Sequence, residues 1–299
     1  MGQLALAALT MDRSSRSQQS PRFTLVLGSG GVKSIAGLGA MQVLEAEGLY
    51  PSGVVGCSAG ALFGALIAAG HRTGEAIALA RSLWSRDITS RRRYRALFQI
   101  ALPKLARFDD GFALRDDTLI RQRLEAAFGS VRIEDLALPL RVHATDAHTG
   151  EPVVLQHGCL TDALRASVAL PFLFAPHRVR GRLLVDGSLS DPLPLGNPDP
   201  GHATVALGFR VPFPRNAYTA SRLATRITAS LSNNLLDARV AAADHTKLLL
   251  MLPELPRRVG LFDTDAMPDL LEVGRQAARA ALPRLHAMLG QSVRLAATG

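Results

Sequence analysis

The stretch that decides the fold is "RFTLVLGSGGVKSIAGLGAMQVLEAEGLYPSGVVGCSAGALFGALIAAG", residues 22–70 of the 299-residue chain. Two short apolar runs, at Arg22–Leu27 and within Pro51–Gly56, stop at glycines and predict buried strands. Helical periodicity follows each run, over Ser34–Glu47 and Ala59–Ala69. Strand, glycine loop, helix, strand, tight turn and helix in succession predict an α/β fold, a parallel sheet flanked by helices.

The remainder of the chain continues this alternation. The segment 75–130 is more polar and predicts mostly helices. The elements expected beyond it are strands within 138–155, 181–195, 203–209 and 246–252, and helices at 161–169 and 267–289. Because no repeat or linker interrupts the pattern, we expect one domain: a disordered tail at 1–21, a core at 22–199, and 200–299 completing the same domain.

The charge balance points to an anionic partner. The formal net charge is +9, with 34 Lys and Arg against 25 Asp and Glu. Nucleic acid or phospholipid headgroups would suit this excess, although an arginine-rich composition from a GC-rich genome explains it equally well. Within the segment Arg91–Phe98, four arginines stand beside Tyr94 and could contact an anionic bilayer, but a solvated helix face gives the same pattern.

Composition also narrows the compartment and the chemistry. Cys57 and Cys159 are too few for a disulfide framework or a zinc site, so no metal is expected. No apolar run approaches the roughly 20 residues of a spanning helix. The N-terminal stretch is a poor signal peptide, since no basic region precedes its short apolar patch. We therefore expect a cytoplasmic protein, soluble or peripheral to the inner face of the membrane.

The first glycine loop does not fit a nucleotide. If the dinucleotide pattern G-x-G-x-x-G begins at Gly28 and Gly30, its third glycine falls on Lys33, whose side chain prevents close helix packing. The phosphate-binding loop pattern also fails, because Leu27 stands where its first glycine belongs. What remains is a loop in which Gly28, Gly30 and Gly31 let backbone N–H groups converge before a helix.

The second glycine motif carries a nucleophile. Gly56-Cys57-Ser58-Ala59-Gly60 is a G-x-S-x-G sequence between an expected strand and an expected helix, the context of a nucleophile elbow. The glycines permit the sharp turn that raises the serine hydroxyl above the sheet. The N-terminus of the following helix favours negative charge near Ser58. The structural alternative is a turn of small residues with a buried serine.

A serine nucleophile needs a base, and two kinds of base are open. None of the eight histidines stands in a motif that would hold it over Ser58. Asp186 is the stronger candidate, because it ends the apolar run of "GRLLVDGSLSDPLPL" and Gly187 allows close approach. A Ser-Asp-His triad using His202 or His245 is the alternative. A plain Asp-Gly turn would give the same local pattern.

These residues together resemble the patatin-like phospholipase family. The resemblance rests on "GSGGVK" at 28–33, the elbow at 56–60 and Asp186-Gly187-Ser188, supported by the stretches 143–155 and 163–194. It covers residues 22–199 well and the C-terminal hundred loosely. It implies a three-layer α/β/α fold with a mostly parallel central sheet. The activity implied is a serine-dependent lipid acyl hydrolase of the phospholipase A, lysophospholipase or esterase type.

The resemblance also implies roles for individual residues. Ser58 would be the nucleophile and Asp186 its base, without a histidine or a cofactor. The loop residues Gly28, Gly30, Gly31 and Val32 would form the oxyanion hole. The substrate would be a phospholipid or another lipid ester, and no nucleic acid is expected as a partner.

Three positions depart from the family pattern: Ser29 stands where glycine is frequent, Lys33 where arginine is usual, and Ser188 where glycine or alanine is usual. Lys33 keeps the positive charge but loses the bidentate geometry of arginine, so it is the departure that could change activity. Two alternatives stay open beside the dyad. One is an α/β-hydrolase esterase with a Ser-Asp-His triad, and the other is a non-catalytic basic binding protein.

Overall fold

The computed structural model describes residues 23–101, 109–196, 201–216 and 218–297. The tail expected at 1–21 lies outside this part of the chain. The strands are β1 (Phe23–Leu27), β2 (Gly53–Cys57), β3 (Leu140–Asp146), β4 (Pro152–Leu155), β5 (His177–Val179), β6 (Arg182–Asp186), β7 (Ala203–Leu207) and β8 (Leu248–Met251). They form one sheet with the order β5-β6-β3-β2-β1-β7-β8, and β4 pairs with β3 off this path.

The sheet has a parallel centre and an antiparallel side. The strands from β3 to β8 along this order pair in parallel, whereas β4 and β6 run antiparallel to β3, and β5 antiparallel to β6. The carboxyl ends of β1 and β2, followed by the two glycine motifs, therefore lie at the same edge. Asp186 ends β6 opposite Ala144 of β3, so an antiparallel strand brings it to that edge as well.

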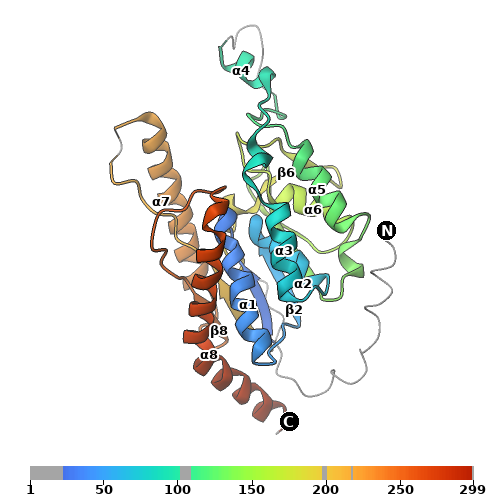
Figure 1. The fold of residues 1–299 in the computed structure, drawn as a ribbon, viewed down its shortest axis with the longest axis vertical. Helices are drawn as coiled ribbons and strands as arrows, with labels where there is room; N and C mark the ends of the chain where they lie inside the picture. Colours follow the sequence, from blue (N-terminus) through green and yellow to red (C-terminus); the bar gives the residue numbers. More distant parts are fainter. Residues whose placement is uncertain (1–22, 102–108, 197–200, 217, 298–299) are drawn as a thin grey trace.

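Helices cover both faces of the sheet (Figure 1). They are α1 (Ala36–Ala46), α2 (Ala59–Ala68), α3 (Thr73–Leu83), α4 (Tyr94–Ala101), α5 (Thr118–Phe128), α6 (Leu160–Ser167), α7 (Ala220–Ala241) and α8 (Met267–Ala297). The short 3-10 turns are η2 (Gly31–Ile35), η3 (Arg86–Thr89), η4 (Ile133–Asp135), η5 (Gly187–Leu189) and η6 (Thr264–Ala266). None of the described helices is long and apolar enough to cross a membrane.

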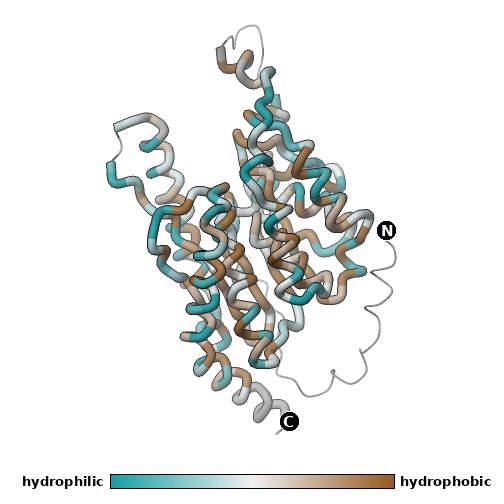
Figure 2. Tube along the Cα trace, in the orientation of Figure 1, coloured by the Kyte–Doolittle hydropathy of each residue, from teal (hydrophilic) through white to brown (hydrophobic). Residues whose placement is uncertain are grey.

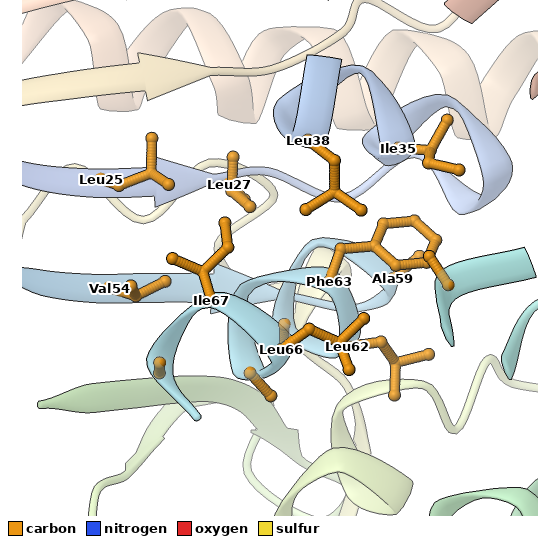
Figure 3. Packing of buried hydrophobic residues seen from close by; sticks show 14 of the residues in the cluster. Leu25, Leu27, Ile35, Leu38, Val54, Ala59, Leu62, Phe63, Leu66 and Ile67 are labelled. Atoms are coloured by element: carbon orange, nitrogen blue, oxygen red, sulfur yellow. The ribbon is translucent and has the colours of Figure 1, made fainter. Parts of the chain in front are cut away.

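The strands bury opposite side chains in two separate cores because successive side chains point to opposite faces. Leu25 and Leu27 of β1 face the larger core with Leu38 of α1 and Phe63 of α2 (Figure 3). Val26 faces the smaller core, which α7 covers through residues such as Leu236. Hydrophobic colour is correspondingly concentrated in the interior of Figure 2. The fold is the expected mostly parallel α/β/α arrangement.

The structure differs from the expected elements in three places. The helix expected at Ser34 begins as η2 and becomes α-helical at Ala36. The final helix continues past 289, because Gly290 is exposed and tolerated in a helix interior at a cost of roughly 1 kcal/mol. The sequence did not predict β5, which has only 3 residues and pairs with β6 across a tight hairpin.

Candidate active site

Ser58 occupies the sharp turn between β2 and α2. Its backbone angles are φ 55° and ψ −132°, a left-handed conformation that costs a non-glycine residue of order 1–3 kcal/mol. The turn requires small neighbours: a Cβ at Gly56 would lie 2.4 Å from Ala61 Cα, and one at Gly60 2.4 Å from the carbonyl oxygens of Leu27 and Gly28. The contact of Gly60 also places the elbow directly against the first glycine loop.

Asp186 contacts the Ser58 hydroxyl from a position 128 residues later in the chain. Ser58 Oγ donates a hydrogen bond to Asp186 Oδ2 at 2.7 Å, and both side chains are buried. The register of the sheet explains the meeting: Cys57 pairs with His143 on β3, and the next residue of β3, Ala144, pairs with Asp186. The topology thus brings together the two residues that the sequence had singled out.

Backbone and hydroxyl groups fix the Asp186 carboxylate. Its second oxygen, Oδ1, accepts a hydrogen bond from the Ser188 amide at 2.9 Å. The Thr145 hydroxyl donates to the Asp186 carbonyl at 2.9 Å. A Cβ at Gly187 would lie 2.4 Å from the His143 carbonyl oxygen, so only glycine lets the chain pass here. Oδ2 is therefore aimed at the serine.

Ser167 is a site residue that the sequence analysis did not single out. Its hydroxyl accepts a hydrogen bond from the Ser58 amide at 2.8 Å and donates to the His143 carbonyl at 2.7 Å. The bridge holds the strained residue between α6 and β3. Ser167 lies within the stretch 163–194 that supported the family resemblance, which was the signal available for it.

Burial changes the protonation of the groups around Ser58. Burial raises the pKa of Asp186, against the opposing hydrogen bonds from Ser188 and Ser58. Burial also raises the pKa of the Cys57 thiol, helped by the negative charges of Asp186 and Asp191. A carboxylate with a raised pKa is a stronger base than a free aspartate, and the buried thiol stays protonated and unreactive.

The four loop residues expected to form an oxyanion hole separate into two pairs. The Gly28 amide donates to the Leu207 carbonyl and the Val32 amide to the Leu261 carbonyl, each at 2.9 Å, so neither N–H is free. The amides of Gly30 and Gly31 donate no hydrogen bond within the described part of the chain. Gly31 has φ 62° at the start of η2. Two adjacent free N–H groups thus lie in the loop that packs against the elbow.

Lys33 follows these amides and is almost fully buried. Its ammonium lies 5.8 Å from the centre of the Phe209 ring, a cation–π distance. Burial lowers the pKa of Lys33. Among the residues that the structure describes, no carboxylate forms an ion pair with it.

The histidines stand apart from this pair. No histidine ring is hydrogen-bonded to Ser58 or Asp186 among the residues described here. His202 Nδ1 contacts the Ser52 hydroxyl at 3.2 Å, before β2 begins and so at the opposite edge of the sheet. His143 is buried on β3 with both ring nitrogens unpartnered, and burial lowers its pKa to about 4.

Comparison with solved structures gives distant likenesses. VipD from Legionella pneumophila matches 88% of this chain and 67% of its own, with 15% identity and a TM-score of 0.46. ExoU, in its complex with SpcU from Pseudomonas aeruginosa, matches 89% of this chain and 53% of its own, with 17% identity and a TM-score of 0.40.

Comparison with curated sequences gives closer relatives. An uncharacterized NTE family protein of Mycobacterium tuberculosis is 36% identical over 180 residues, which are 60% of this chain and 46% of that protein. Lysophospholipase NTE1 of Cryptococcus neoformans is 28% identical over 57% of this chain and 10% of its own length. The matched segment is thus less than half as long as these relatives. The model of the patatin-like phospholipases matches residues 25–198, more than half of the chain and all three motifs. The chain belongs to the patatin-like phospholipase family.

Proposed function

We propose that the chain is a serine-dependent lipid acyl hydrolase that cleaves carboxylic esters through the pair Ser58 and Asp186. The observation that carries this proposal is the 2.7 Å hydrogen bond from Ser58 Oγ to Asp186 Oδ2, on a serine held at φ 55°. Membership of the patatin-like phospholipases supports a lipid ester as substrate. The name of the fungal relative, a lysophospholipase, supports the same class.

The reaction follows from the positions of these groups. Ser58 Oγ attacks the ester carbonyl carbon while its proton passes to Asp186 Oδ2, for which the raised pKa of Asp186 is favourable. The amides of Gly30 and Gly31 stabilise the oxyanion that forms. The intermediate collapses to an acyl-serine, and Asp186 returns the proton to the departing alcohol. Water then attacks the acyl carbonyl carbon while Asp186 takes its proton. The second tetrahedral intermediate expels Ser58 Oγ, which takes that proton back from Asp186, and the fatty acid leaves.

The location and partners follow from the substrate. We propose that the protein acts in the cytoplasm and contacts an anionic membrane surface peripherally, where its lipid substrate resides. The net charge of +9 supports this contact. Lys33, a buried cation beside the two free amides, is proposed to support negative charge in the loop.

Substitution of the pair tests the proposal. Ser58→Ala and Asp186→Asn are each expected to lower kcat/KM for a soluble p-nitrophenyl ester, and for a micellar lysophospholipid, by roughly 10³-fold or more. Ser82→Ala, an exposed serine on α3, is the matched control and should hydrolyse like the parent. A fluorophosphonate should label the parent and the control but not Ser58→Ala. Normal turnover by a folded Ser58→Ala variant would contradict the proposal.

A histidine substitution separates the dyad from the triad. His143 is the stringent choice because it lies on β3 and pairs with Cys57, the residue before Ser58. The His143→Leu variant removes only ring nitrogens that have no hydrogen-bond partner, so we expect it to keep hydrolysis within about threefold of the parent. Loss of activity at this position, or at His202 or His245, in a folded variant would favour the triad.

A further inference from the structure

The N-terminal half of α7 extends away from the body of the protein. Residues 222–228 are all exposed, whereas the later residues Ala229, Asn233 and Leu236 are buried against the sheet side of the helix. Figure 1 shows this half of α7 reaching upward beside, but apart from, the remaining helices. Two turns whose side chains stay exposed gain little stability from tertiary packing, so another reason for this extension is needed.

The extended half carries an apolar stripe. Leu223, Ile227 and Leu231 follow one another at intervals of four residues, and helical geometry places them on one face. Their side chains are 49%, 54% and 65% exposed. The buried positions Ala229 and Leu236 lie on a different face, so the stripe points away from the core. Single exposed leucines are common in proteins, but an aligned row of three is not.

Arginines flank this stripe. The sequence from 200 to 236 contains no aspartate or glutamate and four arginines, of which Arg210 pairs with Asp237. Arg222 donates to the Asn216 side chain, and Arg226 donates to the Pro214 carbonyl at 3.4 Å. Within the described chain, neither guanidinium forms an ion pair with a carboxylate. Both charges are available to an anionic partner.

The stripe lies at the end of the molecule that bears the candidate active site. The chain between β7 and α7 leaves the same sheet edge as the two glycine loops, and Phe213 and Tyr218 are exposed in it. Phe172, in the loop before β5, and Leu189, in η5 directly after Asp186, are also exposed. Tyr50 is the one large exposed hydrophobic residue of the described chain that precedes a strand at the opposite edge.

We propose that the N-terminal half of α7 is a docking helix for an anionic phospholipid bilayer. Leu223, Ile227 and Leu231 enter the boundary between headgroups and acyl chains, and Arg222 and Arg226 contact the lipid phosphates. An amphipathic helix with arginines beside its apolar face binds such surfaces by this combination. The inference rests on the proposed function, because it names the surface that brings Ser58 to its lipid.

The structure favours α7 over the arginine cluster at 91–95. Arg95 forms an ion pair with Asp109, so part of that charge is already neutralised within the protein. Tyr94 and Phe98 on α4 are exposed, and Figure 1 shows α4 extending towards the same end as α7. They form a second contact, while α7 supplies the aligned stripe and the unpaired charge.

Vesicle flotation of the full chain tests this docking surface. The parent is expected to bind phosphatidylcholine vesicles that contain phosphatidylglycerol and to bind pure phosphatidylcholine vesicles much more weakly. The triple variant Leu223→Gln, Ile227→Gln, Leu231→Gln should bind the anionic vesicles at least about tenfold more weakly. The double variant Arg222→Gln, Arg226→Gln should bind them roughly 25-fold more weakly, at about fivefold per arginine.

Matched control variants make the same kinds of substitution at exposed positions away from α7. Arg81→Gln with Arg121→Gln removes two exposed arginines from α3 and α5, and Tyr50→Gln removes the exposed aromatic residue at the opposite edge. Both controls should bind anionic vesicles like the parent. Equal binding by the triple variant and the parent would overturn the proposal, as would equal loss in the controls.

Two further measurements distinguish membrane docking from dimerisation and from a general loss of catalysis. If the stripe instead packs against a second copy of the chain, light scattering should show that the parent is a dimer and the triple variant a monomer, while vesicle binding is unchanged. This result would also overturn the proposal. Hydrolysis of a soluble p-nitrophenyl ester tests the active site independently. The triple variant should keep that hydrolysis, whereas turnover retained in Ser58→Ala would contradict the proposed function and leave the docking result standing.

Discussion

The two faces of the sheet are covered in opposite ways. On one face, α1 and α8 pack so closely that a Cβ at Gly39 would lie 2.1 Å from the Leu271 carbonyl oxygen, and one at Gly274 1.9 Å from the Ala36 carbonyl oxygen. On the other face, α7 touches the smaller core through a few residues, including Leu236, and leaves its first half in solvent. One face of the sheet is therefore tightly packed, whereas the helix on the other face is partly exposed to solvent.

This difference in packing separates the face that supports the candidate active site from the face that is free to contact a partner. The elbow and the glycine loop lie beside the tightly packed face, where α2 is buried along its whole length. A strained serine persists only where its surroundings fix it, and this face provides that support. On the loosely covered face, no hydrogen bond joins the exposed half of α7 to Ser58 or Asp186 within the described chain. Substitutions at four places test this division, in order of decreasing effect.

The largest effect is expected where α1 and α8 meet. Gly274→Ala places a methyl group against the Ala36 carbonyl and should force the helices apart, lowering the free energy of unfolding by about 3 kcal/mol. Gly290→Ala, later in the same helix, is the matched control. A Cβ there meets nothing within 4 Å, so this change should stabilise by up to about 1 kcal/mol. Urea unfolding measures both, and similar values for the two variants would refute the close packing.

The second effect concerns the link between α7 and the site. Arg239 of α7 lies with its Nε 3.3 Å from Asp191 Oδ1 and donates to the Ser190 carbonyl at 3.1 Å. Burial raises the pKa of Asp191 to about 6, so the folded state binds the proton more tightly than the unfolded state does. This contribution to stability is full at low pH and is lost as the pH rises from about 4 to about 6.

Asp191→Asn should remove that loss. The difference in the free energy of unfolding between parent and variant should change by roughly 2–3 kcal/mol across this window and stay flat above it. His143, whose pKa is lowered to about 4, titrates in the opposite sense, but it is present in both proteins and cancels in the difference. Urea unfolding at a series of pH values measures this difference, and a constant value would contradict the assignment.

The sequence pattern predicted those parts of the candidate site that are formed by residues close together in the sequence. The alternation over residues 22–70 predicted both glycine turns, because strand, turn and helix signals there are short-range. The end of an apolar run singled out Asp186. Pattern could not predict the Ser167 bridge to the Ser58 amide or the use of the Val32 amide by Leu261, because these contacts join distant segments through the sheet. Nor could it predict that half of α7 would stay exposed.

A smaller effect is expected at Asp186 itself, between the two faces. Burial of the carboxylate raises its pKa, so its ionised form lowers stability at neutral pH. Asp186→Asn removes the charge and should raise the free energy of unfolding by about 1 kcal/mol while hydrolysis is lost, as functional residues often trade stability for activity. Thermal unfolding measures the change. A fall in Tm comparable to that of Gly274→Ala would show that this carboxylate is structural.

The smallest effect is expected on the exposed half of α7. Leu223→Gln, Ile227→Gln and Leu231→Gln replace side chains that already face solvent with another good helix former, so each should change the free energy of unfolding by less than about 0.5 kcal/mol. Leu236→Gln, on the buried face of the same helix, should cost several times more because it places an amide in the smaller core. Urea unfolding compares the four. If all four variants lost the same free energy of unfolding, the exposed half of α7 would contribute to folding. If the three exposed positions lost almost none and the variants bound vesicles more weakly, these residues would contribute to membrane binding and not to the stability of the fold.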